Sequence, residues 1–198
     1  MSRFIDIFGD YVGMVFERDL VANGLTLDDV SEALRCGEIA ECKMEIPEGR
    51  AWGIRRYFGW VNDYLEPVIR VEDYERYYID GYKYGYYTGI CCANKLSLLN
   101  QMFFEVTITS KLVFKSLSFE CDGFRVNLEP LIGDLNNIFE IMYADIFNRV
   151  RRLTDLDISI NVLKEDLIRR SVDLNLLKSK LVVDSVVKDL EVLFDVTS

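Results

Sequence analysis

Glu41 and Lys43 have the Glu-x-Lys spacing of metal-dependent nucleases, and they are the first candidates for chemistry in this chain. Such enzymes bring two carboxylates and a lysine to a divalent cation, and Asp28 or Asp29 is the candidate second acid. The 198 residues include no histidine, which excludes a Ser-His or Cys-His nucleophile pair and a His-ligated metal. Three-residue patterns arise often by chance, so a carboxylate-dependent nuclease ranks third among the hypotheses for this chain, behind the two given below. We expect the protein to have no enzymatic activity and to bind no cofactor or metal.

The densest cluster of basic and aromatic residues lies between positions 50 and 60. It contains Arg50, Arg55 and Arg56 interleaved with Trp52, Tyr57, Phe58 and Trp60. Arginines beside aromatic rings suit phosphate contact with base stacking, or an interface hot spot. The alternative is that the aromatic rings belong to the core and that the arginines pair with acids such as Asp63 and Glu66.

The composition indicates a folded, acidic protein. Hydrophobic residues make up 50% of the chain and aromatic residues 13%, which is enough for a substantial core. A net charge of −10 argues against broad attraction to nucleic acid, although a local basic patch remains compatible with it. The five cysteines lack Cys-x-x-Cys spacing, which favours buried thiols. Without a long apolar run, we expect no membrane span and a cytoplasmic location.

The first third of the sequence predicts three helices followed by a hairpin. The expected helices are residues 4–8, 16–22 and 27–35, and the expected strands are 39–44 and 51–54. Thr26 is a good N-cap for the third helix, and Gly37 follows its last turn. Pro47 to Arg50 form the predicted turn. This order is typical of a winged helix-turn-helix.

The third helix bears directly on DNA recognition, because it is the helix that would enter a major groove. Side chains that read bases and phosphates are mostly Arg, Lys, Asn, Gln and Ser. This helix instead presents Asp28, Asp29 and Glu32, and its candidate contacts are Thr26, Ser31 and Arg35. Its acidic face is equally consistent with solvent exposure or with a basic protein partner.

The remaining residues predict a small antiparallel sheet packed with helices. Residues 88–99 have helical spacing. Phe104, Val106 and Ile108 then alternate with Glu105, Thr107 and Thr109, as expected for a strand with one buried face. Two further strands, 113–120 and 123–128, flank an Asp-Gly turn. Helices are expected at 138–153, 160–172 and 174–194. The fold class is therefore α+β, with a winged-helix domain at 1–62 and a second α+β domain at 63–198.

Two segments together resemble the AbiEi-type antitoxins of type IV toxin–antitoxin systems. The second domain is similar at Ala93-Asn94, at Asn100-Gln101 and in the strand from Glu105 to Thr109. The first domain is similar at Arg18 to Thr26, at Val30 to Leu34 and at Gly37-Glu38. The resemblance implies a winged helix that binds operator DNA and a second domain that neutralises a partner toxin of the nucleotidyltransferase kind.

The leading hypothesis is thus a non-enzymatic, antitoxin-like transcriptional regulator that binds DNA and also contacts a partner protein. Its expected DNA-binding residues are Thr26, Ser31, Arg35, Arg50, Arg55 and Arg56. The alternative is an acidic protein-interaction module, as in a viral or mobile-element protein, that keeps a winged-helix scaffold without binding DNA.

Overall fold

The computed structural model describes residues 2–9, 11, 13–44, 46, 50–58, 63–99, 104–156 and 158–195, with backbone alone at 56–58, 63–65 and 195. The fold is mixed α and β, and the chain divides into two compact units, Met1–Tyr77 and Tyr78–Ser198. This division is later than the boundary expected near residue 62. Residues after the hairpin belong to the first unit because the Asp73 carboxylate accepts a hydrogen bond from Met14 N (2.8 Å).

The first unit contains four helices and five strands among its described residues. They are α1 (Arg3–Phe8), β1 (Val15–Phe16), α2 (Glu17–Ala22), α3 (Leu27–Arg35), β2 (Ile39–Cys42), β3 (Ala51–Ile54), β4 (Arg56–Phe58), β5 (Asp63–Leu65) and α4 (Val71–Tyr78). The strands β1, β3 and β2 form an antiparallel sheet in that order, and β4 pairs with β5. The predicted pairing of residues 39–44 with 51–54 is confirmed, with Ile39 opposite Ile54.

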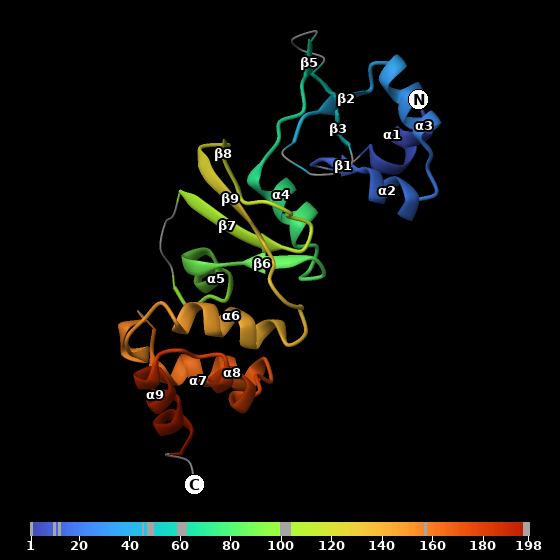
Figure 1. Ribbon diagram of the computed structural model, residues 1–198. Helices are drawn as coiled ribbons and strands as arrows, with labels where there is room; N and C mark the ends of the chain where they lie inside the picture. The colour runs from blue at the N-terminus through green and yellow to red at the C-terminus, as the bar shows by residue number, and fades with distance from the viewer. Residues whose placement is uncertain are drawn as a thin grey trace. The chain divides into compact units, whose positions relative to one another are not determined.

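The core of the first unit is built from one apolar face of each helix and of the three-stranded sheet. Its fully buried residues include Phe4 of α1, Leu20 of α2, Ala33 of α3 and Trp52 of β3. The second predicted helix begins one residue late, at Glu17, because Val15 and Phe16 pair with β3. Figure 1 shows the three N-terminal helices gathered beside this sheet.

The second unit contains a four-stranded sheet followed by helices. Its elements are β6 (Gly85–Tyr87), α5 (Gly89–Lys95), β7 (Glu105–Ser110), β8 (Leu117–Cys121), β9 (Phe124–Pro130), α6 (Ile138–Phe147), the 3-10 turn η1 (Leu153–Asp155), α7 (Ile160–Arg169), α8 (Leu174–Ser179) and α9 (Asp184–Asp195). The sheet order is β6-β7-β9-β8.

The prediction of an antiparallel sheet was wrong for one central pair, because β7 and β9 run parallel. After β7 the chain crosses to the sheet's margin, forms β8 and returns through a tight hairpin into the position beside β7. The hairpin itself was predicted correctly, although β8 begins only at Leu117. Val106 and Ile108 of β7 lie beside Val126 and Leu128 of β9, and all four side chains are buried.

The segment before β7 forms a short helix, as expected. Helix α5 follows Thr88 and buries Cys91, Cys92 and Ala93 against its neighbours. The helical spacing of residues 88–99 predicts Ile90 on the apolar side with Ala93 and Leu96, but Ile90 is 52% exposed. The Asn100-Gln101 turn lies outside the described residues.

The terminal helices are shorter than the periodicity predicts. The helix expected over 138–153 ends at Phe147, and the helix expected over 174–194 is interrupted between α8 and α9. Figure 1 shows α6 lying between α5 and the three C-terminal helices α7, α8 and α9. No helix among the described residues has the length and apolar character needed to cross a bilayer.

Candidate functional site

Helix α3 begins at a well-formed capping box. The Thr26 N–H donates to Asp29 Oδ2 (2.7 Å), the Thr26 hydroxyl donates to the same oxygen (2.9 Å), and the Asp29 N–H donates back to Thr26 Oγ (3.4 Å). These hydrogen bonds, with the nearby charge of Arg3, hold the pKa of the Asp29 carboxyl below its ordinary value. The side chain of Thr26, one of the expected DNA contacts, is therefore engaged in the helix start.

The solvent face of α3 carries Asp28, Ser31, Glu32 and Arg35, which recur at spacings of three and four residues. All four residues are exposed. The Ser31 hydroxyl donates to the Leu27 carbonyl (2.8 Å), so its donor is satisfied within the helix. Of the three DNA contacts predicted on this helix, only Arg35 carries a positive charge. The acids Asp28 and Glu32 lie on the same face.

Two apolar side chains border this acidic face. Leu27 is 48% exposed and Leu34 is 37% exposed, one at each end of α3. We call the set formed by Leu27, Asp28, Ser31, Glu32, Leu34 and Arg35 the α3 surface. It combines negative charge with exposed apolar area, which is the composition of a surface that meets protein more readily than phosphate.

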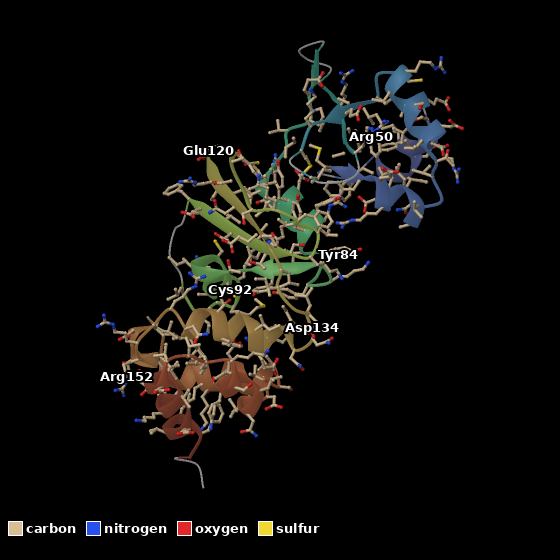
Figure 2. The ribbon with its side chains drawn as sticks, in the orientation of Figure 1. Arg50, Tyr84, Cys92, Glu120, Asp134 and Arg152 are labelled. Atoms are coloured by element: carbon tan, nitrogen blue, oxygen red, sulfur yellow. The ribbon has the colours of Figure 1, made fainter. Side chains whose placement is uncertain are left out.

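Two of the predicted arginine contacts, Arg50 and Arg55, lie apart from each other. Arg50 and Arg55 flank opposite ends of β3, and its four residues of extended chain place their Cα atoms roughly 16 Å apart. Arg50 forms an ion pair with Glu41 (3.6 Å), and Arg55 forms one with Glu66 (3.1 Å). Figure 2 labels Arg50 beside the three-stranded sheet. Arg56 lies in β4, where only the backbone is described.

The aromatic part of the expected cluster belongs at least partly to the core. Trp52 is 1% exposed and packs with Phe4 and Leu20, so it offers no stacking surface. The side chains of Tyr57 and Phe58, and the whole of Trp60, lie outside the described residues. For Trp52, the alternative that its ring belongs to the core is confirmed.

A different arginine–aromatic cluster joins α4 to the rest of the first unit. The Arg76 guanidinium lies 4.4 Å from the Phe16 ring centroid and 5.0 Å from the Tyr11 ring centroid, and it pairs with Asp19 at 3.0 Å. The Arg18 guanidinium lies 5.0 Å from the ring centroid of Tyr77. The sequence did not predict this cluster because its residues are about sixty positions apart. For example, the Arg18 guanidinium donates a hydrogen bond to the Tyr77 carbonyl.

The segment from Glu66 to Arg70 approaches β3 closely at Gly53. A Cβ atom built on Gly53 would lie 2.0 Å from Pro67 Cβ, so glycine is required for the two backbones to approach. Asp73 then fixes the segment, because its carboxylate accepts from Arg70 N (2.9 Å) as well as from Met14 N. A cleft of ≈ 460 Å³ lies beside it, lined by Tyr11, Gly13, Met14, Ile54, Glu66, Pro67, Val68, Arg70, Glu72 and Asp73.

The second unit holds a buried ionic cluster around Asp166. Its carboxylate accepts hydrogen bonds from the Tyr143 hydroxyl, from Arg169 and from Arg170 Nε (3.0 Å). Burial raises the pKa of the Asp166 carboxyl, but these hydrogen bonds outweigh burial and hold the pKa below its ordinary value. Burial and the Asp166 contact raise the pKa of the Tyr143 hydroxyl far above 10. With every oxygen of the carboxylate engaged, the cluster is suited to hold α7 on α6 and not to move protons.

The residues of the nuclease hypothesis are not arranged as a metal site. Glu41 faces Arg50, and Asp29 caps α3. Within the described ranges, no group of three or more Cys, Asp and Glu side chains is placed to hold a metal ion. Burial raises the pKa of both the Cys91 and Cys92 thiols, as expected for packing residues.

No family model matches this chain, and no curated protein shows significant similarity to it.

Proposed function

We propose that the first unit is a winged helix and that the protein is a non-enzymatic, antitoxin-like regulator that acts by binding another protein through the α3 surface. The order α1, β1, α2, α3, β2, β3, with β3 between β1 and β2, supports the winged-helix assignment. In that arrangement α3 corresponds to the helix that winged-helix proteins present to the major groove of DNA.

The composition of the α3 surface is the observation that carries this proposal. Asp28 and Glu32 lie one turn apart and would face phosphates with like charge. Exposed Leu27 and Leu34 supply the apolar contact area that protein interfaces bury at their centres. An acidic face bordered by exposed apolar side chains fits a partner with a basic surface.

The partner class is a nucleotidyltransferase-type toxin with a basic surface. The resemblance to AbiEi-type antitoxins supports the toxin class, and the net charge of −10 supports the basic surface. Opposite net charges would accelerate association of the two proteins and would make its rate fall with ionic strength.

Operator DNA is the second candidate partner, and exposed Arg35 together with Arg50 favours it. Their positions correspond to a recognition helix and a wing in the proposed winged helix. DNA binding would have to open the Arg50–Glu41 and Arg55–Glu66 ion pairs, which are exposed and therefore weak. Salt-sensitive DNA binding that depends on Arg55 and Arg56 distinguishes this candidate from the first.

The test of the proposal is calorimetric titration of the chain with the product of a neighbouring nucleotidyltransferase gene. Replacing both Asp28 and Glu32 by Lys is expected to weaken binding at least about tenfold, because like charges would then meet. The matched control replaces two other exposed acids of the same unit, Glu17 and Glu72, by Lys. Equal affinities for the two double variants would contradict a role for the α3 surface.

A further inference from the structure

Strand β8 forms one margin of the four-stranded sheet and, among the described strands, pairs with β9 alone. The opposite margin, β6, has three residues and is wholly buried. Strand β8 has five residues, and Leu117, Ser118 and Glu120 are exposed. Figure 2 labels Glu120 at the outer end of the strand, away from α5 and α6. An accessible strand margin of this length is a template for pairing with another chain.

The β8–β9 hairpin determines which backbone groups point away from the sheet. Asp122 (φ 51°) and Gly123 (φ 77°) form its two-residue loop, and both have the positive φ of a type I′ turn. Cys121 and Phe124 therefore form the hydrogen-bonded pair that closes the loop. Since such pairs alternate along an antiparallel ladder, Ser118 and Glu120 direct their N–H and C=O groups outward.

We propose that β8 pairs antiparallel with β8 of a second copy of this chain, about a two-fold axis at Phe119. In this register Ser118 lies opposite Glu120 of the second copy, so the outward N–H and C=O groups of both residues meet matching partners. Two four-stranded sheets thereby become one continuous sheet of eight strands.

The side chains of β8 are self-complementary in this register. Leu117 meets Cys121 of the second copy, and Phe119 meets its own equivalent, all on the face that carries the buried Val126 and Leu128. Leu117 is 40% exposed in the single chain and gains an apolar neighbour. A shift by two residues in one direction would place Glu120 against Glu120, and like charges directly opposite are destabilising.

Strand β8 also lacks two of the features that usually block such pairing, proline and lysine. Its sequence, Leu117 to Cys121, contains no proline and no lysine. Its polar face is ordered by hydrogen bonds, with the Ser118 hydroxyl donating to Asn127 Oδ1 (2.8 Å) and accepting from Arg125 Nε (3.2 Å).

Each copy carries a net charge of −10, so added salt should strengthen this association. A basic partner at the same margin would show the opposite salt dependence.

Sedimentation equilibrium of the full chain provides the first test. We expect a concentration-dependent species of twice the monomer mass, and we expect Ser118→Pro to weaken its formation at least about tenfold, through loss of an outward N–H. Bonding between β8 and β9 does not use that N–H, and Ser118→Ala, which keeps it, is expected to dimerise like the wild type. A chain that remains monomeric up to about 200 µM would overturn the proposal.

Disulfide trapping provides a test that does not depend on the proline variant. Phe119 pairs with its own equivalent at a non-hydrogen-bonded position, where Cα atoms lie about 4.5 Å apart and within disulfide range. Phe119→Cys, made with Cys36→Ser to remove an exposed thiol, is expected to form a reducible covalent dimer under mild oxidation. Glu129→Cys, on an exposed position of β9, is the matched control and should remain monomeric. If the chain dimerises but Phe119→Cys forms no covalent dimer, β8 is not the interface. The same conclusion follows if Glu129→Cys forms the covalent dimer equally well.

Discussion

The side-chain amide of Asn148 bridges the interruption between α8 and α9, with its oxygen accepting a hydrogen bond from Val182 N at 2.8 Å. Its nitrogen donates to the Lys180 carbonyl at 3.2 Å. One side chain from the end of α6 thus replaces two backbone bonds that a continuous helix would have made. The interruption needs neither glycine nor proline, because a tertiary contact satisfies the freed backbone groups.

Replacing Asn148 by Ala should lower the free energy of unfolding by about 0.5–1.5 kcal/mol, because it removes the hydrogen bonds to the Val182 N–H and the Lys180 carbonyl, which water can partly replace. Urea denaturation followed by circular dichroism measures this change. Asn175→Ala, at an exposed position of α8, is the matched control and should cost less than about 0.5 kcal/mol. An unchanged midpoint for Asn148→Ala would mean that the interruption does not depend on this amide.

Gly53→Ala should destabilise the first unit by about 1–3 kcal/mol, because the new methyl group would overlap Pro67. Pro67→Gly removes the overlapping atoms, so the double variant should lose less stability than the sum of the two single variants. Thermal denaturation of the four chains measures this coupling. Strict additivity would contradict the close approach of residues 53 and 67.

The Asp166 cluster predicts acid sensitivity. Because its folded-state pKa lies below that of the unfolded chain, about 3.9, the ionised carboxylate stabilises the fold above that pH. This stabilisation is lost as the pH falls through the folded-state pKa. Between about pH 5 and pH 2, stability should therefore fall more steeply for the wild type than for Asp166→Asn. The exposed neighbour Glu165→Gln should retain the wild-type slope, and equal slopes for all three chains would refute the prediction.

Thiol labelling should proceed in separate phases. Cys36 is exposed, whereas Cys91 and Cys92 are buried and burial raises the pKa of each thiol. Reaction requires an accessible thiolate, so Cys36 should react first and the buried pair only on unfolding. Spectrophotometric titration with a disulfide reagent measures this order. Persistence of the fast phase in Cys36→Ser would assign it to another cysteine.

Local signals in the sequence were sufficient for elements whose boundaries depend on nearby residues. The Thr26 N-cap, the Asp122-Gly123 hairpin and the burial of Val106 and Ile108 on one face of a strand all appear in the structure. The predicted alternation fails at the two ends of that strand, where Phe104 is 68% exposed and Thr109 is buried. Each rests on interactions within a few residues, which sequence patterns report directly.

Features that depend on distant residues were not predictable in the same way. Nothing in residues 174–194 marks the break before α9, because Asn148 supplies its hydrogen bonds from α6. The parallel pairing of β7 with β9 depends on where the chain places β8, which local periodicity does not encode. The acids that pair with Arg50 and Arg55 likewise became evident only from the fold, although Glu66 was among the partners considered.

The most direct test of the proposed role of α3 is a mobility-shift titration with DNA from upstream of the gene, at about 50 mM and 200 mM salt. If α3 serves a protein partner, the wild type and the Arg50, Arg55 and Arg56→Ala variant should both leave the DNA unshifted at both salt concentrations. Arg151→Ala, an exposed arginine of the second unit, is the control for general charge effects. A shift that weakens with salt, disappears in the triple variant and survives in Arg151→Ala would contradict this account and establish DNA as the partner of the first unit.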